Sequence, residues 1–347
     1  MKYRLSQIRI WYDKINKSDD LNDLVNKLNI DRNQLVLLSM SRSYHVFTIP
    51  KKDGSFRLIE DPQKNLKELQ REFNKYLQAV YYLHQTEAAF GFIIHVKEGK
   101  YRKDILNNAR RHLGHRYMLK IDLEDFFHQV GIKRVARILQ SKPFIFRREP
   151  ARTLARLFTY KQRLPMGAPT SPVLSNFATM GLDKALYLWA ASQNITYTRY
   201  ADDMTFSSGS TLLTDSHLRQ ITGICNNYRF ELNKEKTVFY GPQDEKKVTG
   251  LILTPGGVDI EDGFYVELDE DLVRLKHLVE SMIITREDRE NPILVKMKQE
   301  VKGKINFIGM IEGYQSVQYN TYSNMLYDAL HPKEEQLFIR WQHFNYL

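Results

Sequence analysis

Cysteine is almost absent from this chain, which has one, Cys225, among 347 residues. A single thiol excludes an internal disulfide and any metal site built from several cysteines. No apolar run approaches the roughly 20 residues that a membrane-spanning helix needs, and Met1–Leu5 lacks the apolar segment of a signal peptide. Internal repeats and low-complexity linkers are missing as well. We therefore expect a protein of the cytoplasm that has no membrane partner.

Positive charge, by contrast, is in excess. Lysine and arginine number 51 against 41 aspartate and glutamate residues, which gives a net charge of +10 and a pI near 9.3. This balance favours a polyanionic partner such as nucleic acid; an anionic membrane surface would explain the charge too, but no membrane segment accompanies it. The chain is longer than one hydrophobic core usually serves, so we expect two or three subdomains.

The spacing of apolar residues predicts a chain that mixes helices and strands. Helices are expected over 5–45 (with Ser18–Asp20 as an N-cap), 64–84, 132–140, 150–160, 173–192, 212–229 and from about 268 onward. Strands are expected over 44–49 and 55–59 around an Asp53-Gly54 turn, over 116–122, 195–200 and 204–207, and in a strand-turn-strand region over 236–260. The order strand, helix, hairpin, helix, strand predicts an α+β fold with a split βαβ sheet.

Three carboxylates stand at the ends of predicted strands. Asp202 and Asp203 form the tip of a hairpin, although aspartate is depleted in strands. Without a cation the two would repel, and one would tend to take up a proton. In a split βαβ sheet Asp122, which ends the strand over 116–122, would converge with them. Three such carboxylates can hold two Mg²⁺ ions, which clamp the oxygens of a phosphoryl displacement; solvated acidic turns are the competing interpretation.

Four segments, in this order along the chain, resemble motifs of reverse transcriptases. Lys120–Phe127 resembles the first palm motif and Leu164–Pro172 the nucleotide-binding motif. Tyr200–Asp203 resembles the second palm motif and Leu232–Thr237 the palm motif that follows it. The resemblance implies an RNA-directed DNA polymerase with a right-hand fold of fingers, palm and helical thumb. It implies an N-terminal helical extension over 1–45, fingers over 46–115 and the first part of the palm over 116–131. An insertion with the nucleotide-binding loop would follow over 132–172, the rest of the palm over 173–262 and the thumb over 263–347.

Two shorter signatures resemble those of retron reverse transcriptases. Asn108–His112 fits the pattern Asn-Ala-x-x-His, and Val248–Gly250 fits Val-Thr-Gly. The resemblance implies that Asn108, His112, Val248, Thr249 and Gly250 contact RNA or DNA. Alternatively, His112 is a packed residue at a helix end, and Thr249 and Gly250 form an ordinary strand turn.

The resemblance also assigns roles at the catalytic centre. Asp122, Asp202 and Asp203 would be catalytic and would bind two Mg²⁺ ions, with the backbone carbonyl of Leu123 as a further ligand. Lys236 would donate a proton to the departing pyrophosphate, although a surface lysine is the alternative and Lys234 competes for the role.

Further residues would bind the incoming deoxynucleotide. Lys51, Lys52 and Arg57 would grip its triphosphate, although a solvated basic hairpin would look the same. Phe127 would lie beneath the sugar and exclude a 2′-hydroxyl; as a core residue, the neighbouring Phe126 is the better candidate.

The nucleotide-binding loop and the C-terminal region complete the list of expected contacts. Gly167 and Ala168 would let the backbone approach the nucleotide. Met166 stands where glutamine is common in the family, and a thioether offers only apolar contact and a weak acceptor. In the C-terminal region, Lys302 and Lys304 would contact the phosphates of the template–primer duplex.

Retron enzymes resembling this chain bind a structured noncoding RNA encoded beside them. The resemblance implies priming from a guanosine 2′-hydroxyl and a branched RNA–DNA product, multicopy single-stranded DNA, made from dNTPs. It implies anti-phage defence with a separate effector protein, and template removal by a host ribonuclease H. The alternatives are another bacterial reverse transcriptase, either group II intron-like or defence-associated, and a non-catalytic RNA-binding scaffold.

Overall fold

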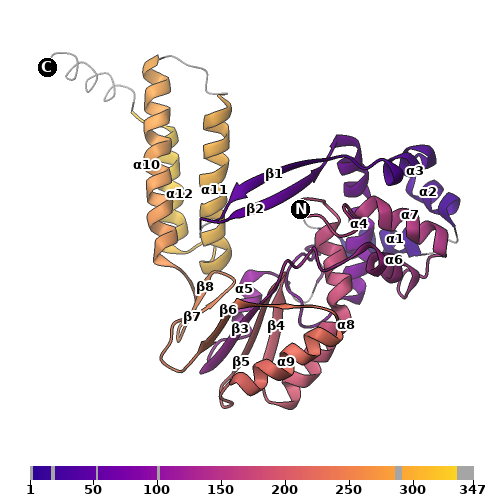
Figure 1. Cartoon of the computed structure of the whole chain (residues 1–347). Helices are drawn as coiled ribbons and strands as arrows, with labels where there is room; N and C mark the ends of the chain where they lie inside the picture. Colours follow the sequence, from indigo (N-terminus) through magenta and orange to yellow (C-terminus); the bar gives the residue numbers. More distant parts are fainter. Residues whose placement is uncertain (1–2, 17–19, 52–53, 100–101, 286–290, 334–347) are drawn as a thin grey trace. The chain divides into compact units, whose positions relative to one another are not determined.

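The computed structural model describes residues 3–16, 20–51, 54–99, 102–285 and 291–333. The chain forms two compact units, Met1–Thr249 and Gly250–Leu347, and each is described here by itself. Figure 1 shows the order of the elements along the chain. The predicted Asp53 turn position, Ser18 and Asp19 lie outside the described residues.

Three short helices begin the first unit. They are α1, α2 and α3, over Leu5–Asn16, Leu21–Leu28 and Arg32–Met40. Asp20 caps α2 as predicted, because its Oδ1 accepts a hydrogen bond of 2.9 Å from the amide of Asp23. Asp31 caps α3 in the same way through the amide of Asn33, at 2.8 Å. The N-terminal region is therefore three short helices, of which α2 and α3 begin at an aspartate cap.

A β-hairpin and a long helix follow, as the sequence predicts. Strands β1 (Tyr44–Pro50) and β2 (Phe56–Pro62) are antiparallel, with Ile49 opposite Arg57. Helix α4 (Lys64–His84) then packs against α1 and against a later helix, α8.

The central sheet has four strands, all antiparallel. They are β3, β4, β5 and β6, over Tyr117–Leu123, Thr196–Tyr200, Asp203–Ser208 and Leu232–Tyr240. Their order in space is β4-β5-β3-β6, so β3 lies beside the β4–β5 hairpin. This arrangement confirms the predicted α+β class and the predicted neighbours of β3. Strand β6 begins four residues before the expected strand-turn-strand region.

Further helices follow in the first unit, and α8 packs against β4 of this sheet. They are α5, α6, α7, α8 and α9, over Ile105–Arg110, Ile132–Gln140, Arg148–Phe158, Ser171–Ser192 and Asp215–Asn227. Helices α8 and α9 run side by side next to the sheet (Figure 1). Leu119 and Ile121 of β3 are buried in the core. Because side chains alternate along a strand, Lys120 and Asp122 lie on the opposite face. Helix α5 was not among the predicted elements.

The second unit is a hairpin followed by three helices. After β7 (Lys246–Val248), which closes the first unit, come β8, β9, α10, α11 and α12 over Leu251–Thr254, Gly257–Ile260, Asp262–Thr285, Pro292–Glu312 and Val317–Leu330. The three helices pack pairwise around buried apolar residues such as Leu275 and Ile308. In the part of the chain that the structure describes, we find no helix with the length and apolar character required to cross a membrane.

Truncation of Leu186 tests the core beneath the sheet. Leu186 on α8 is fully buried, whereas Leu188 on the same helix is 59% exposed. We expect Leu186→Ala to lower the free energy of unfolding by about 2–5 kcal/mol. The control Leu188→Ala should stay within about 0.5 kcal/mol of wild type, measured by chemical denaturation. Equal losses for both variants would contradict this packing.

Candidate active site

The hairpin turn at Ala201 and Asp202 has an unusual backbone. Tyr200 pairs with Asp203, which leaves two loop residues, and Ala201 has a φ of 59°. A positive φ at the first loop residue is where hairpins usually place glycine. The Asp202 carbonyl accepts a hydrogen bond of 3.1 Å from the amide of Leu123. The turn is thereby tied to the end of β3.

The structure brings the three predicted carboxylates to one end of the sheet. Asp122 on β3 lies directly opposite Asp203 on β5, so both side chains are on the same face, and Asp202 is in the adjoining turn. Burial, followed by the charge of Asp202, raises the pKa of Asp122 to about 6. Burial also raises the pKa of Asp202. We call these three residues the carboxylate cluster.

Lys236 on β6 contacts this cluster. Its Nζ lies 3.3 Å from Oδ1 of Asp122, although 55% of its side chain is exposed. Burial lowers the pKa of Lys236, but the neighbouring Asp122 carboxylate outweighs it, so the pKa is raised overall. Burial raises the pKa of Asp202 overall, and the positive charge of Arg57 on β2 opposes this rise. Both predicted cations therefore lie near the carboxylates.

The donor chemistry of the cluster suits a hard divalent cation. Carboxylate oxygens are the preferred ligands of Mg²⁺, and a bound cation would relieve the repulsion between Asp122 and Asp202, which adds to burial in raising the pKa of Asp122. Across the described residues, no three or more acidic, histidine or cysteine side chains are arranged to enclose an ion in this conformation. The carboxylates would have to rotate, and substrate phosphates would have to supply further ligands.

The predicted nucleotide-binding loop is fastened to the β1–β2 hairpin through Glu60. The amide of Glu60 donates to the carbonyl of Met166 at 2.7 Å. Its fully buried carboxylate binds the Arg163 guanidinium at 2.6 and 3.1 Å. Gly167 has a φ of 131°, and a Cβ there would lie 2.8 Å from the Glu60 carbonyl oxygen. Close contact with β2 thus requires glycine at this position. Ala168 beside it is buried.

Sequence reasoning missed Glu60 and Arg163. A charged residue in an exposed hairpin gives no sign that it is buried, and its partner lies 103 positions away.

Phe126 and Phe127 differ in how far they are buried. Phe126 is 5% exposed and belongs to the core. Phe127 is only partly buried, with its ring centroid 5.9 Å from that of Phe92. Lys51 at the hairpin end is exposed, and Lys52 lies outside the described residues.

The two retron-like signatures meet in space. Asn108, His112 and Val248 each expose 1% or less of their surface. Thr249 Oγ1 donates to the carbonyl of Ile105, at the start of α5, over 3.4 Å. The residues expected to contact nucleic acid therefore include three whose side chains lie inside the protein. In this structure they support the fold instead of presenting a surface to RNA.

His112 is the centre of this packing. Its ring nitrogens hydrogen-bond the hydroxyls of Ser207 and Thr198 at 2.6 and 2.7 Å. Burial, with smaller contributions from His115 and Arg111, lowers the pKa of His112 to about 3. The histidine is therefore neutral and joins the turn after α5 to β4 and β5. The alternative interpretation of His112 as a packed residue describes this environment.

Lys302 and Lys304, the two predicted phosphate contacts of the second unit, have different surroundings. Lys302 is exposed, as phosphate contact requires. Lys304 instead binds Asp271 at 2.6 Å and Glu267 at 3.0 Å, both on α10. The predicted phosphate contact of Lys304 is not what the structure shows, because two carboxylates already neutralise its charge.

Thr249 and Gly250 have positive φ values of 50° and 81°, which fit a turn.

Comparison with known proteins agrees with this geometry. Residues 49–253 match the family model described as reverse transcriptase (RNA-dependent DNA polymerase). The Retron Ec86 reverse transcriptase of Escherichia coli is 31% identical over 244 residues, covering 70% of this chain and 73% of the relative. The Retron Mx65 reverse transcriptase of Myxococcus xanthus is 34% identical over 232 residues, covering 60% of this chain and 51% of the relative.

Among solved structures, telomerase from Candida albicans in complex with a TWJ fragment of telomeric RNA matches 84% of this chain and 64% of that one, with 11% identity and a TM-score of 0.45. The match to the Myxococcus xanthus retron enzyme spans about half the length of that relative. The chain belongs to the reverse transcriptase family, the RNA-dependent DNA polymerases. Within that family it is of the retron type.

Replacement of His112 should change how stability depends on pH. Because the folded-state pKa of His112 is about 3 against 6.5 for the free side chain, only the unfolded chain gains this proton as the pH falls below 6.5. Wild type should therefore lose about 1.4 kcal/mol more per pH unit than His112→Gln between about pH 6 and about pH 4. Chemical denaturation across this range measures the difference.

The matched control is His45→Gln, at an exposed position of β1. Its pH dependence should follow wild type. Identical slopes for wild type and His112→Gln would contradict a buried, neutral His112.

Proposed function

We propose that this retron-type reverse transcriptase copies part of a cognate structured noncoding RNA into multicopy single-stranded DNA. DNA synthesis starts from the 2′-hydroxyl of a guanosine in that RNA, so the product is branched. The retron relatives and the signatures at Asn108–His112 and Val248–Gly250 support this assignment. The net charge of +10 suits an RNA partner.

One observation carries the proposed chemistry: Asp122, Asp202 and Asp203 converge at one end of the sheet beside Lys236. Two Mg²⁺ ions held by these carboxylates and the Leu123 carbonyl would supply Lewis-acid activation of the primer hydroxyl and neutralise the triphosphate. The side chains of the protein orient the reactants and move protons.

Residues around the cluster would then act on the nucleotide. Lys236 donates a proton to the departing pyrophosphate, because its ammonium is already held beside Asp122. Lys51, Lys52 and Arg57 bind the triphosphate from the hairpin, and Phe127 lies beneath the sugar. Met166, Gly167 and Ala168 form the wall of the nucleotide site, held against β2 by Glu60.

The biological setting extends this proposal. The RNA–DNA product and the enzyme would restrain a separate effector protein as part of an anti-phage system. A host ribonuclease H would remove the copied template. The effector would be found among the proteins that copurify with the complex.

Asp202→Asn/Asp203→Asn tests the polymerase chemistry. Neutral amides cannot replace the anionic ligands, so the rate of dNTP incorporation on a primed RNA should fall by at least about 10³-fold, or ~4 kcal/mol of transition-state stabilisation. The control Asp215→Asn, at an exposed position in the first turn of α9, should behave as wild type. A wild type that incorporates no dNTP on any RNA template would refute the proposal.

The same two proteins, expressed in cells, test the retron assignment. Wild type should copurify with a short DNA joined to RNA by a 2′,5′ linkage, and the double variant should copurify with RNA alone. Ordinary cellular RNA on active wild type would instead favour another bacterial reverse transcriptase.

Phe127→Ala tests nucleotide selection. Loss of the ring should admit a 2′-hydroxyl, so the preference for dNTP over rNTP should fall by about 10-fold or more, since one steric contact of this kind is worth 1–3 kcal/mol. The preference is measured as a ratio of kcat/KM values on one primed RNA. Tyr187→Ala, at a partly exposed aromatic position of α8, serves as the control. Unchanged discrimination in Phe127→Ala would remove Phe127 from the sugar site.

A further inference from the structure

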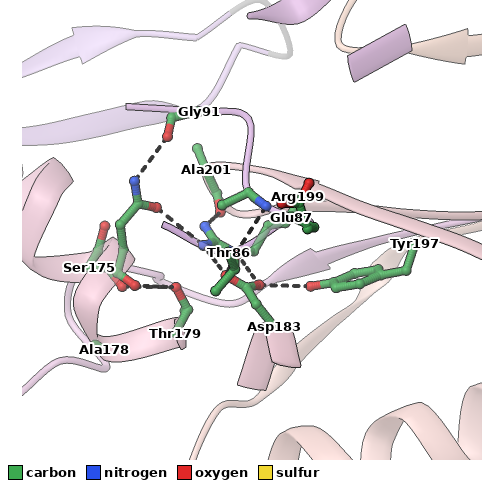
Figure 2. Close-up of polar contacts among 12 residues, drawn as sticks. Thr86, Glu87, Gly91, Ser175, Ala178, Thr179, Asp183, Tyr197, Arg199 and Ala201 are labelled. Atoms are coloured by element: carbon green, nitrogen blue, oxygen red, sulfur yellow. Dashed lines mark hydrogen bonds and ion pairs between the residues drawn. The ribbon is translucent and has the colours of Figure 1, made fainter. Parts of the chain in front are cut away.

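A buried ion pair lies beneath the turn that carries Asp202. Figure 2 shows Arg199, from β4, facing Asp183, from α8. Both side chains are fully buried. The guanidinium Nε and Nη2 donate to the two carboxylate oxygens at 2.8 and 2.7 Å. The Tyr197 hydroxyl donates to the same carboxylate at 3.1 Å, so the acceptor is well satisfied.

Stability alone gives a weak reason for such a pair. Removing two charges from water costs free energy that their attraction returns only with good geometry, and apolar residues of similar size often serve a core as well. Burial lowers the pKa of Arg199, but the Asp183 charge outweighs this and raises it overall, so the guanidinium stays charged. The remaining donors of Arg199 show what else the pair does.

Arg199 Nη1 donates to the carbonyl of Ala201 at 2.7 Å. Ala201 is the residue with the positive φ of 59°, a conformation that costs roughly 1–2 kcal/mol for a residue with a Cβ. The next carbonyl, that of Asp202, is held by the Leu123 amide. The backbone carbonyls of both loop residues therefore accept hydrogen bonds from groups outside the turn, the Arg199 guanidinium and the Leu123 amide.

Asn176 on α8 connects this pair to a second support. Its Oδ1 accepts from Arg199 Nη2 at 3.2 Å, and its Nδ2 donates to the carbonyl of Gly91 at 2.9 Å. Gly91 is pressed against the turn, since a Cβ there would lie 2.6 Å from the Ala201 nitrogen. The chain before Gly91 also pairs with β4, because the Arg199 amide donates to Ala88 and the Phe90 amide donates to the Arg199 carbonyl, each at 2.8 Å.

We propose that Arg199, oriented by Asp183 and Asn176, is a positioning residue that fixes the backbone of the Ala201–Asp202 turn and thereby the placement of the Asp202 carboxylate. Arg199 does not reach the substrate; it acts through the turn. The inference rests on the proposed role of the carboxylate cluster. Catalytic geometry is sensitive to displacements of about 1 Å, which explains why charged groups would be kept in this core.

The double variant Arg199→Met/Asp183→Leu removes both charges together, so no unpaired ion is left in the core. We expect it to fold, to bind primed RNA as wild type does and to keep the KM for dNTP. The single-turnover rate of incorporation should fall by about 10-fold or more, because misplacing a reacting group costs rate rather than binding. Amide hydrogen exchange of the 199–203 segment should be faster, with residues 117–120 of β3 unchanged.

Leu186→Ala is the control for destabilisation alone. It lowers stability from the same helix as Asp183 without touching the turn, so well below its unfolding transition its rate and its exchange at 199–203 should match wild type. Wild-type rate and exchange in the double variant would overturn the proposal, as would an equal loss of rate in Leu186→Ala.

Gly91→Ala approaches the turn from its other side and serves if the double variant does not fold. Its Cβ must displace the Ala201 nitrogen, so the same fall in rate and faster exchange at 199–203 are expected. Gly223→Ala, with open space around a Cβ in α9, is the matched control and should behave as wild type. Unchanged rate and exchange in Gly91→Ala would overturn the proposal.

Exchange separates this inference from the proposed function. If wild type incorporates no dNTP, the polymerase proposal fails while the exchange of the 199–203 segment still decides whether Arg199 holds the turn.

Discussion

Antiparallel pairing of β3 with β5 is the interaction on which the candidate site depends. It places Asp122 opposite Asp203 and lets the Leu123 amide reach the Asp202 carbonyl. Because side chains alternate along β3, the register that sends Leu119 into the core sends Asp122 to the other face. A slip by one residue would exchange the two faces. The hydrophobic core under the sheet therefore sets the positions of the carboxylates.

This placement works against local energetics at several points. Burial and the neighbouring Asp202 charge raise the pKa of Asp122 to about 6, and Ala201 takes a backbone conformation usually left to glycine. Neighbouring side chains hold these features: Lys236 lies beside the cluster, and Arg199, itself bound by Asp183 on α8, lies beneath the turn. Conflicts of this kind, held by surrounding structure, are typical of functional sites. They are concentrated here at one end of the sheet.

Much of the fold could be predicted from local pattern. The β1–β2 hairpin, the long helices α4 and α8, and β3 as neighbour of the β4–β5 hairpin all follow from periodicity and turn residues. The buried pairs could not be predicted. Arg199 and Asp183 look like ordinary charged residues in a strand and a helix, and only their shared burial makes them partners. The expectation that Lys304 contacts phosphate failed for the same reason. A sequence does not show which acidic residues face a lysine, and here Asp271 and Glu267 do.

By itself, the sequence determined which residue types stand at the ends of which strands, and hence the carboxylate cluster and the family motifs. Alternation and turn chemistry are local, so they can be read along the chain. Tertiary structure decided which residues are covered. His112, Asn108 and Val248 form an internal joint between α5 and the sheet, while Lys236 stays at the surface beside Asp122. Burial depends on segments distant in sequence that pack together, and no local pattern carries that information.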